Sequence, residues 1–134
     1  MMKTAVRYFS RSGNTQALAE AIARKAGVKA VSVDEKDAPI QETSDLLFIG
    51  GGLYAYGLDK HLKEYIRTLD PEKVKKAAVF STSWLSRHGL DLLKKELSEK
   101  GIAVAEEVNY ARNHPDDAAI ARAAEITGRL MEEK

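Results

Sequence analysis

The sequence predicts an α/β fold: a three-layer, doubly wound domain whose five parallel strands have the order 2-1-3-4-5. Short apolar runs alternate with amphipathic helical patterns along the whole chain, which is typical of a parallel sheet covered by helices on both faces. A turn rich in hydroxyl groups follows the first apolar run and precedes the first helical pattern. Ligands bind at such a turn in doubly wound sheets, so this turn supports the same fold.

The first third of the chain contains two strands and one helix. The apolar run Thr4–Phe9 predicts strand one, and the helical pattern from Thr15 to Ala26 ends at Gly27, a residue that favours helix ends. Strand two is short and covers Lys29–Val33. The stretch 34–44 is polar and contains a proline, so we expect a loop there.

The middle of the chain repeats the strand-to-helix pattern. Strand three is expected at Leu46–Ile49 and ends in three consecutive glycines. A helix then starts at Asp59, a good N-cap, and stops at Asp70-Pro71.

The last third contains two strands and two helices. Strand four is expected at Ala77–Phe80, and strand five at Ile102–Val108. Between them runs a helix that ends at Lys100-Gly101 and buries a stripe of leucines, and Pro115 is expected to open the final helix.

The predicted strand order fixes where a ligand should lie. Strands one and three are neighbours whose connections leave in opposite directions, so their carboxyl ends form a crevice. We therefore expect the segments 10–15, 50–58 and 81–89 to line one site.

Composition excludes several classes of protein. At 134 residues, the chain is assigned to one domain, 1–134, and its lack of cysteine excludes disulfides and thiolate chemistry and fits a cytoplasmic location. The net charge of +1 predicts no nucleic-acid partner, and no apolar run approaches the ~20 residues that span a membrane. No signal-type segment is recognised, and the histidines lack metal-ligand spacing, so we expect no metal site.

The turn Ser10-Arg11-Ser12-Gly13-Asn14-Thr15 is predicted to bind a phosphate group. Its hydroxyl groups can donate hydrogen bonds, and the N-terminus of the following helix carries about half a positive charge. The alternative is an ordinary capped helix. Arg11 either adds its charge to the phosphate or points to solvent.

Aromatic residues gather on the other two loops. Aromatics make up 7% of the chain, yet Tyr54, Tyr56 and Trp84, the sole tryptophan, follow predicted strands three and four. Tyrosine and tryptophan offer flat faces that cover a planar ring. Together with the phosphate turn, they predict a site for a phosphorylated planar heterocycle.

On these residues the chain resembles the flavodoxins. The phosphate motif of that family is a hydroxyl residue, any residue, a hydroxyl residue, glycine, any residue and threonine, and Ser10, Ser12, Gly13 and Thr15 meet it. Tyr54 matches the aromatic residue of the family's second loop. The resemblance covers the chain in element order and length, and it implies non-covalently bound FMN with its ring between aromatic residues of two loops.

The cofactor-binding residues implied by the resemblance fall on all three loops. Tyr54 is the first choice to stack on the flavin, Tyr56 the reserve, and Trp84 is expected at the other face. No catalytic residue is assigned. The full set is Ser10, Arg11, Ser12, Gly13, Asn14, Thr15, Gly52, Leu53, Tyr54, Ala55, Tyr56, Gly57, Ser81, Thr82, Ser83 and Trp84.

The function implied is that of a small one-electron carrier that exchanges electrons with redox partner proteins, a reductase and an acceptor, as a monomer or weak dimer. The alternative is a FMN-dependent oxidoreductase of the same fold that acts on a quinone or porphyrinogen. A domain that has lost flavin is a further alternative. A phosphoacceptor receiver domain is excluded, because Ser10-Arg11 and Gly50 stand where that class needs acids.

Two features depart from the electron-carrying flavodoxins. The chain is nearly neutral where those carriers are strongly acidic, and its third loop offers Trp84, Arg87 and His88 instead of an Asp-Tyr pattern. The expected rim of the site therefore carries cationic side chains, namely those of Arg87, His88, Lys60 and His61. We therefore expect the lower flavin potential to be less negative than in an acidic carrier.

Overall fold

A computed structural model describes residues 2–54, 57–82 and 88–132 and confirms the predicted sheet. The sheet is parallel, and its strand order β2-β1-β3-β6-β7 is the expected 2-1-3-4-5 order. Its strands are β1 (Thr4–Phe9), β2 (Ala30–Ser32), β3 (Leu46–Gly51), β6 (Ala77–Thr82) and β7 (Asn109–Ala111). A separate antiparallel pair, β4 (Leu53–Tyr54) and β5 (Gly57–Leu58), was not expected from the sequence.

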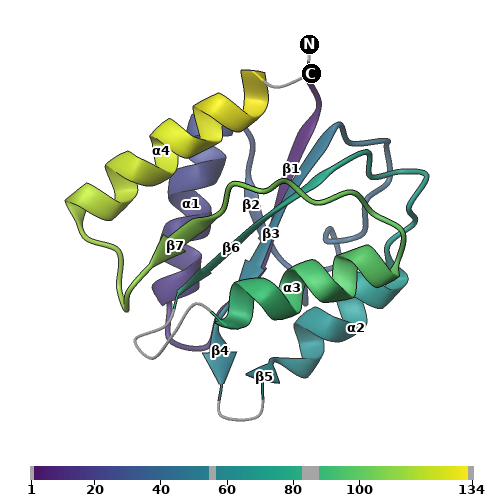
Figure 1. Ribbon diagram of the computed structural model, residues 1–134, viewed down its shortest axis with the longest axis horizontal. Coiled ribbons are helices and arrows are strands. Elements are labelled where there is room, and N and C mark those ends of the chain that lie inside the picture. Colours follow the sequence, from purple (N-terminus) through teal and green to yellow (C-terminus); the bar gives the residue numbers. More distant parts are fainter. Residues whose placement is uncertain (1, 55–56, 83–87, 133–134) are drawn as a thin grey trace.

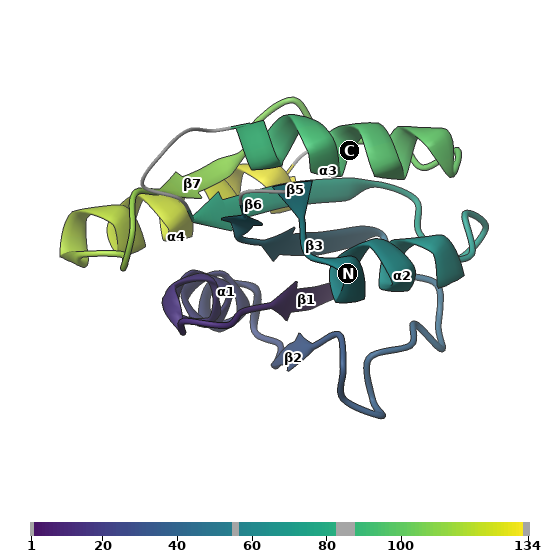
Figure 2. The ribbon, with the colours of Figure 1, turned by 90° about the horizontal axis from the view of Figure 1, so that it is seen from below.

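Helices cover both faces of this sheet, as predicted. The helices are α1 (Asn14–Ala26), α2 (Lys60–Thr68), α3 (His88–Glu99) and α4 (Asp117–Glu132). Figure 1 shows α1 and α4 on one face and α2 and α3 on the other, and the edge view of Figure 2 shows the same three layers. Within the described residues, no helix is both long and apolar enough to cross a membrane.

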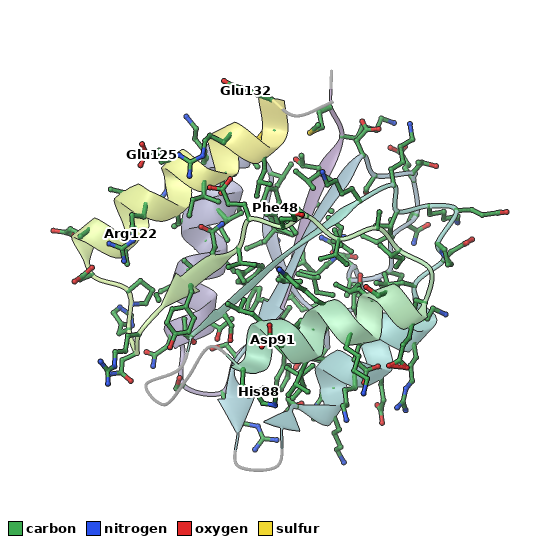
Figure 3. The ribbon with its side chains drawn as sticks, in the orientation of Figure 1. Phe48, His88, Asp91, Arg122, Glu125 and Glu132 are labelled. Atoms are coloured by element: carbon green, nitrogen blue, oxygen red, sulfur yellow. The ribbon has the colours of Figure 1, made fainter. Side chains whose placement is uncertain are left out.

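Successive side chains along each strand point to opposite faces of the sheet, so the hydrophobic core has two halves, one on each face. In β3, Leu47 and Ile49 pack toward α2 and α3, whereas Leu46 and Phe48 pack toward α1 and α4. Phe48 is 1% exposed and lies near the middle of the molecule in Figure 3. A strand buried on both faces reads as a continuous apolar run, which is why β3 is recognisable from the sequence.

The ends of the helices follow the sequence signals. Gly27 adopts a left-handed conformation at the end of α1, and the Asp59 carboxylate accepts a hydrogen bond from the His61 main-chain N–H at the start of α2. Helix α4 begins later than Pro115 suggests, because Asp116 caps it by accepting from the Ala119 N–H.

The predicted position of strand five, 102–108, is wrong. Ala77 on β6 lies opposite Val104 in an isolated bridge, but Phe80, three residues further along β6, pairs with Asn109. The outer chain thus uses two extra residues between these points, and regular pairing resumes only at β7. The alternation of apolar and polar residues in the sequence cannot show such an interruption, because the interruption depends on how the partner strand pairs.

Strands β3 and β6 extend two residues beyond their predicted ends, and two glycines make this possible. A Cβ on Gly50 would lie 2.2 Å from the Phe80 carbonyl oxygen, and one on Gly51 would lie 2.6 Å from a Leu62 methyl carbon. These glycines therefore allow close packing within the sheet and under α2, whereas the sequence suggested that they line a ligand loop.

Arg7, on the inner strand β1, has main-chain carbonyl groups as its partners. Its guanidinium donates to the main-chain carbonyls of Ala38, at 2.7 Å, and of Val6 and Asp37. The Tyr65 hydroxyl donates to the same Ala38 carbonyl. These bonds satisfy a partly buried cation and hold the 34–44 segment against β1.

Candidate functional site

The described parts of the three predicted loops lie at the carboxyl edge of the sheet. Figure 1 shows the N-terminal end of α1 and the β4–β5 pair at this edge. Two buried hydrogen bonds there join α1 to β6 and β6 to β3. Thr15 and Thr82 share a hydrogen bond of 2.7 Å between their hydroxyl oxygens, and the Ser81 hydroxyl donates to the Gly51 carbonyl at 2.7 Å.

The turn between β1 and α1 is organised by its own hydroxyl groups. Ser10 Oγ accepts from the Gly13 N–H at 3.0 Å, and Ser12 Oγ accepts from the Asn14 N–H at 3.4 Å. A hydroxyl that accepts in this way keeps its own hydrogen for a further bond. Both serines can therefore still donate to an anion.

The N-terminus of α1 is suited to an anion. Gly13 stands at the N-cap with φ 91°, and neither a capping side-chain hydrogen bond nor an acidic residue in the first turn serves this described helix end. Main-chain N–H groups at such an end attract a negatively charged ligand. The turn and the helix end together fit a phosphate group.

Thr15 lies deeper than the serines. It is 2% exposed and Thr82 is 6% exposed, so their shared hydrogen bond lies away from solvent. Either oxygen can be the donor; when Thr82 donates, Thr15 keeps its hydrogen. This contact joins the start of α1 to the end of β6.

Asn14 has a partner that the sequence did not suggest. Its side-chain oxygen lies 3.2 Å from His114 Nδ1, on the segment between β7 and α4. Because an amide oxygen only accepts, the imidazole donates and the Asn14 amide N–H groups stay available. No local pattern links residues this far apart in the sequence.

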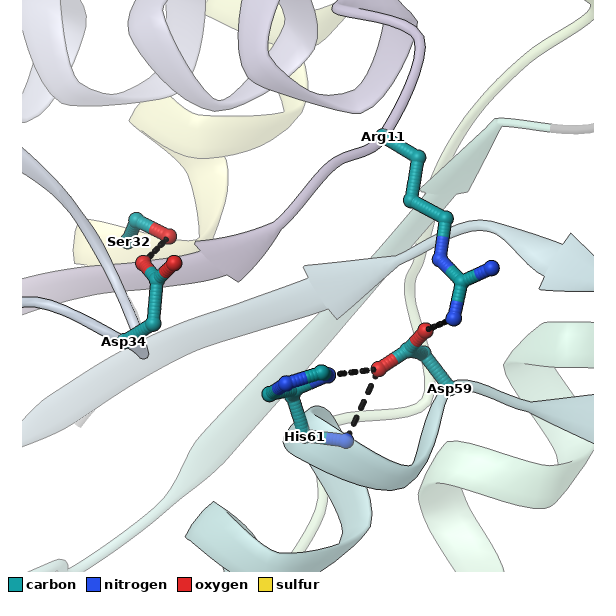
Figure 4. A network of polar contacts seen from close by, with 5 residues as sticks. All are labelled: Arg11, Ser32, Asp34, Asp59 and His61. Atoms are coloured by element: carbon teal, nitrogen blue, oxygen red, sulfur yellow. Dashed lines mark hydrogen bonds and ion pairs between the residues drawn. The ribbon is translucent and has the colours of Figure 1, made fainter.

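Arg11 and Asp59 form an ion pair across the site. Arg11 is on the turn, and Asp59 is the N-cap of α2; a guanidinium nitrogen lies 2.5 Å from Asp59 Oδ2. The other carboxylate oxygen, Oδ1, accepts from both the His61 main-chain N–H and His61 Nδ1, each at 2.8 Å (Figure 4). Neither role predicted for Arg11, binding phosphate or facing solvent, includes this pairing.

This network sets the charge state of Asp59. Burial on its own raises the pKa of this carboxyl, but the hydrogen bonds from His61 and Arg11 outweigh burial and hold the pKa below its ordinary value. Asp59 is therefore a buried anion whose charge is balanced by Arg11.

The other predicted residues are distributed as follows. Ser81 and Thr82 belong to β6 and are buried, so they are strand residues and not the loop residues expected from the sequence. Gly52 follows β3 and is partly buried, and the backbones of Leu53, Tyr54 and Gly57 form the β4–β5 pair. Four predicted residues lie outside the described ones, namely Ala55, Tyr56, Ser83 and Trp84, as does Arg87.

The described residues include no group of three or more side chains suited to a metal ion. At the carboxyl edge of the sheet, the described residues provide hydroxyl and N–H donors. Residues 5–123 match the sequence profile of the family described as Flavodoxin domain. The chain belongs to the flavodoxin domain family.

Solved flavodoxins share the fold over their whole length. Oxidised Flavodoxin 1 from Bacillus cereus is 23% identical, with a TM-score of 0.79 and coverage of 98% of this chain and 99% of that one. A flavodoxin from the domain Archaea is 25% identical, with a TM-score of 0.76 and coverage of 98% and 97%.

The fold also occurs as part of longer proteins. The rubredoxin oxygen:oxidoreductase of Desulfovibrio gigas is 15% identical, with a TM-score of 0.78, and the match covers 94% of this chain but 34% of that one. A search of curated proteins returns no match.

Proposed function

We propose that this flavodoxin-family protein binds FMN and carries electrons one at a time between redox partner proteins. The observation that supports this most directly is the turn before α1. There, Ser10 and Ser12 accept hydrogen bonds from the turn's own N–H groups and keep their hydrogens to donate. Such a turn is organised before a ligand arrives, so little ordering cost opposes phosphate binding.

The phosphate would be held by the turn and the first N–H groups of α1. Ser10, Ser12 and Thr15 supply hydroxyl groups, and Asn14 supplies its amide. Arg11 is paired with Asp59. The phosphate would therefore be bound mainly by the neutral donors of the turn and by the N-terminal end of α1, and less by the charge of Arg11.

The ring would lie between the β4–β5 pair and the segment after β6. Tyr54, with Tyr56 in reserve, and Trp84 are the residues proposed to cover it, in line with the family resemblance. Bound FMN supplies the electron-accepting chemistry, and the chain's own part is to bind and orient the cofactor and to keep water from the covered faces.

The segment between β6 and α4 favours the carrier role over an enzyme. Between β6 and α4, the described residues contain α3, the Val104 bridge and β7, without an added substrate-binding domain. The alternative remains a FMN-dependent oxidoreductase acting on a quinone or porphyrinogen. The whole-length match to solved flavodoxins favours the carrier over it.

The test is a titration of the FMN-free protein with FMN and, in parallel, with riboflavin, which lacks the phosphate. We expect FMN to bind with quenched fluorescence and riboflavin to bind much more weakly. Stepwise anaerobic reduction of the FMN-loaded protein should then proceed in two resolved one-electron steps. A single two-electron step favours the enzyme, and no FMN binding by the folded protein overturns the proposal.

A further inference from the structure

The Arg11–Asp59–His61 network determines which ring nitrogen of His61 carries hydrogen. Both Asp59 oxygens already accept, Oδ2 from Arg11 and Oδ1 from the His61 main-chain N–H. Since an ionised carboxylate only accepts, His61 Nδ1, at 2.8 Å from Oδ1, must be a donor. A neutral His61 therefore has its hydrogen on Nδ1 and a bare Nε2.

The His61 side chain is partly exposed to water, and its ring is held in place. The His61 side chain is 45% exposed, and its ring stacks on Phe9 with centroids 4.7 Å apart and an interplanar angle of 13°. With one face on Phe9 and one edge on Asp59, the imidazole has a fixed orientation. No described residue is seen to bond to Nε2, which leaves that atom to exchange protons with solvent.

The network also lies between the two parts of the candidate site. Phe9 directly precedes the phosphate turn, and Asp59 directly follows β5. Figure 4 shows Arg11 reaching from the turn to Asp59, with His61 on the opposite side of the carboxylate. A charge gained by a cofactor held between the turn and the β4–β5 pair would therefore act on a network that His61 shares with the turn.

We propose that His61 couples proton uptake to electron transfer, with Nε2 binding a proton when the site gains an electron. This inference rests on the proposed function. If FMN held in the site took one electron from a donor protein, Nε2 would take up one proton from the solvent, so the added negative and positive charges would balance. Asp59 is a positioning residue, because it fixes the ring and stabilises its protonated form.

The charges around the ring support this assignment. The described element that carries His61 and those that pack against it include the following charged or titratable groups: Arg7 on β1, Arg11 on the turn, Asp59, Lys60 and Glu64 on or at α2, and His88 and Asp91 at the start of α3. Arginine, lysine and the carboxylates ordinarily keep one charge between pH 5 and 8. The His61 ring contacts an acid directly, since its Nδ1 lies 2.8 Å from Asp59 Oδ1.

The size of the coupling follows from electrostatics. A unit negative charge within about 10 Å, near a protein surface, raises the proton affinity of an imidazole roughly tenfold. By linkage, the same factor appears in the electron affinity when His61 is protonated, and tenfold corresponds to about 59 mV for a one-electron couple.

The first arm of the test is NMR of the histidine rings in the full chain. Spectra are taken without FMN, with oxidised FMN and after full reduction with dithionite. We expect His61 to show the Nδ1–H tautomer when neutral, and Nε2 to bind a proton roughly tenfold more tightly after reduction. His88 and His114 are observed in the same spectra for comparison.

The second arm is the potential measured against pH in two variants. Lys60→Gln removes a neighbouring positive charge but leaves His61 in place, so it should shift the potential and keep its dependence on pH. His61→Phe keeps the stacking on Phe9 but cannot bind a proton, so it should reduce the dependence on pH. Asp59→Asn should weaken proton binding at Nε2, because the neutral amide stabilises the protonated ring less than the carboxylate does.

The outcomes separate the two proposals. FMN binding together with unchanged proton binding by His61 on reduction, or with an Nε2–H tautomer, overturns the coupling and leaves the electron carrier intact. Absence of FMN binding overturns both. The NMR arm needs no variant, so a variant that fails to fold does not affect its result.

Discussion

Gly13 and Gly27 stand at opposite ends of α1 and provide a matched test of the phosphate turn. Both adopt left-handed backbone conformations, with φ of 91° and 74°, and a Cβ at either position meets no atom within 4 Å. Alanine there adds backbone strain without a clash, at about 1–2 kcal/mol per site. We therefore expect Gly13→Ala and Gly27→Ala to lower the free energy of unfolding of the FMN-free protein by similar amounts in urea denaturation.

Their effects on FMN binding should differ. Only Gly13 lies in the turn, where rotation of its peptide would move the N–H groups that now donate to Ser10 and Ser12. Loss of one hydrogen bond to a charged group costs about 1.5–3 kcal/mol. This predicts roughly ten- to 150-fold weaker FMN binding for Gly13→Ala and unchanged binding for Gly27→Ala.

The assay is FMN fluorescence quenching, with riboflavin titrated in parallel. Asparagine tolerates the left-handed conformation, so Gly13→Asn should recover part of both the stability and the FMN affinity. Equal FMN affinity of the two alanine variants would refute the reasoning. So would an equal loss of FMN and riboflavin binding by Gly13→Ala, since the turn would then not recognise the phosphate.

Four further measurements address the sheet, the buried hydroxyls, the acid limb and the potential. Gly50→Ala should cost about 1–3 kcal/mol or more in urea denaturation because its Cβ meets main chain. Gly51→Ala meets a movable side chain and should cost less, and equal losses contradict the close packing. A Thr15→Val and Thr82→Val double-mutant cycle should give a coupling of about 1 kcal/mol, whereas additive losses mean independent hydroxyls. The lowered pKa of Asp59 stabilises the fold above its unfolded value of about 3.9, and this contribution disappears as pH falls through the folded pKa. The stability gap between wild type and Asp59→Asn should therefore shrink below about pH 4, and a constant gap excludes this role. Each cation about 8 Å from the flavin should raise its lower potential by roughly 40–90 mV, and a potentiometric titration giving the value of an acidic flavodoxin would contradict that expectation.

The parts of the fold that could be predicted are those specified by local patterns. The continuous apolar run of β3 and the glycine that ends α1 depend on residues close in sequence, and both were recognised. β7 was placed too early because its position depends on where β6 pairs with it, and the two extra residues after Val104 leave no local signal. The β4–β5 pair was missed for a similar reason, since strands of two residues are too short to show a period.

Asp59 in the candidate site also combines a feature that local sequence predicts with one that depends on a distant segment. Asp59 was predicted as the N-cap of α2, and its Oδ1 does accept from the His61 N–H. Capping leaves the second oxygen without a partner, and a buried carboxylate is stable only when its remaining acceptor positions are also used. At 1% exposure, Asp59 therefore requires a donor from a neighbouring segment, and the adjacent phosphate turn provides Arg11. The need for a partner follows from the cap and its burial, but the identity of the partner depends on the strand order, because only the neighbouring positions of β1 and β3 bring residues 11 and 59 together.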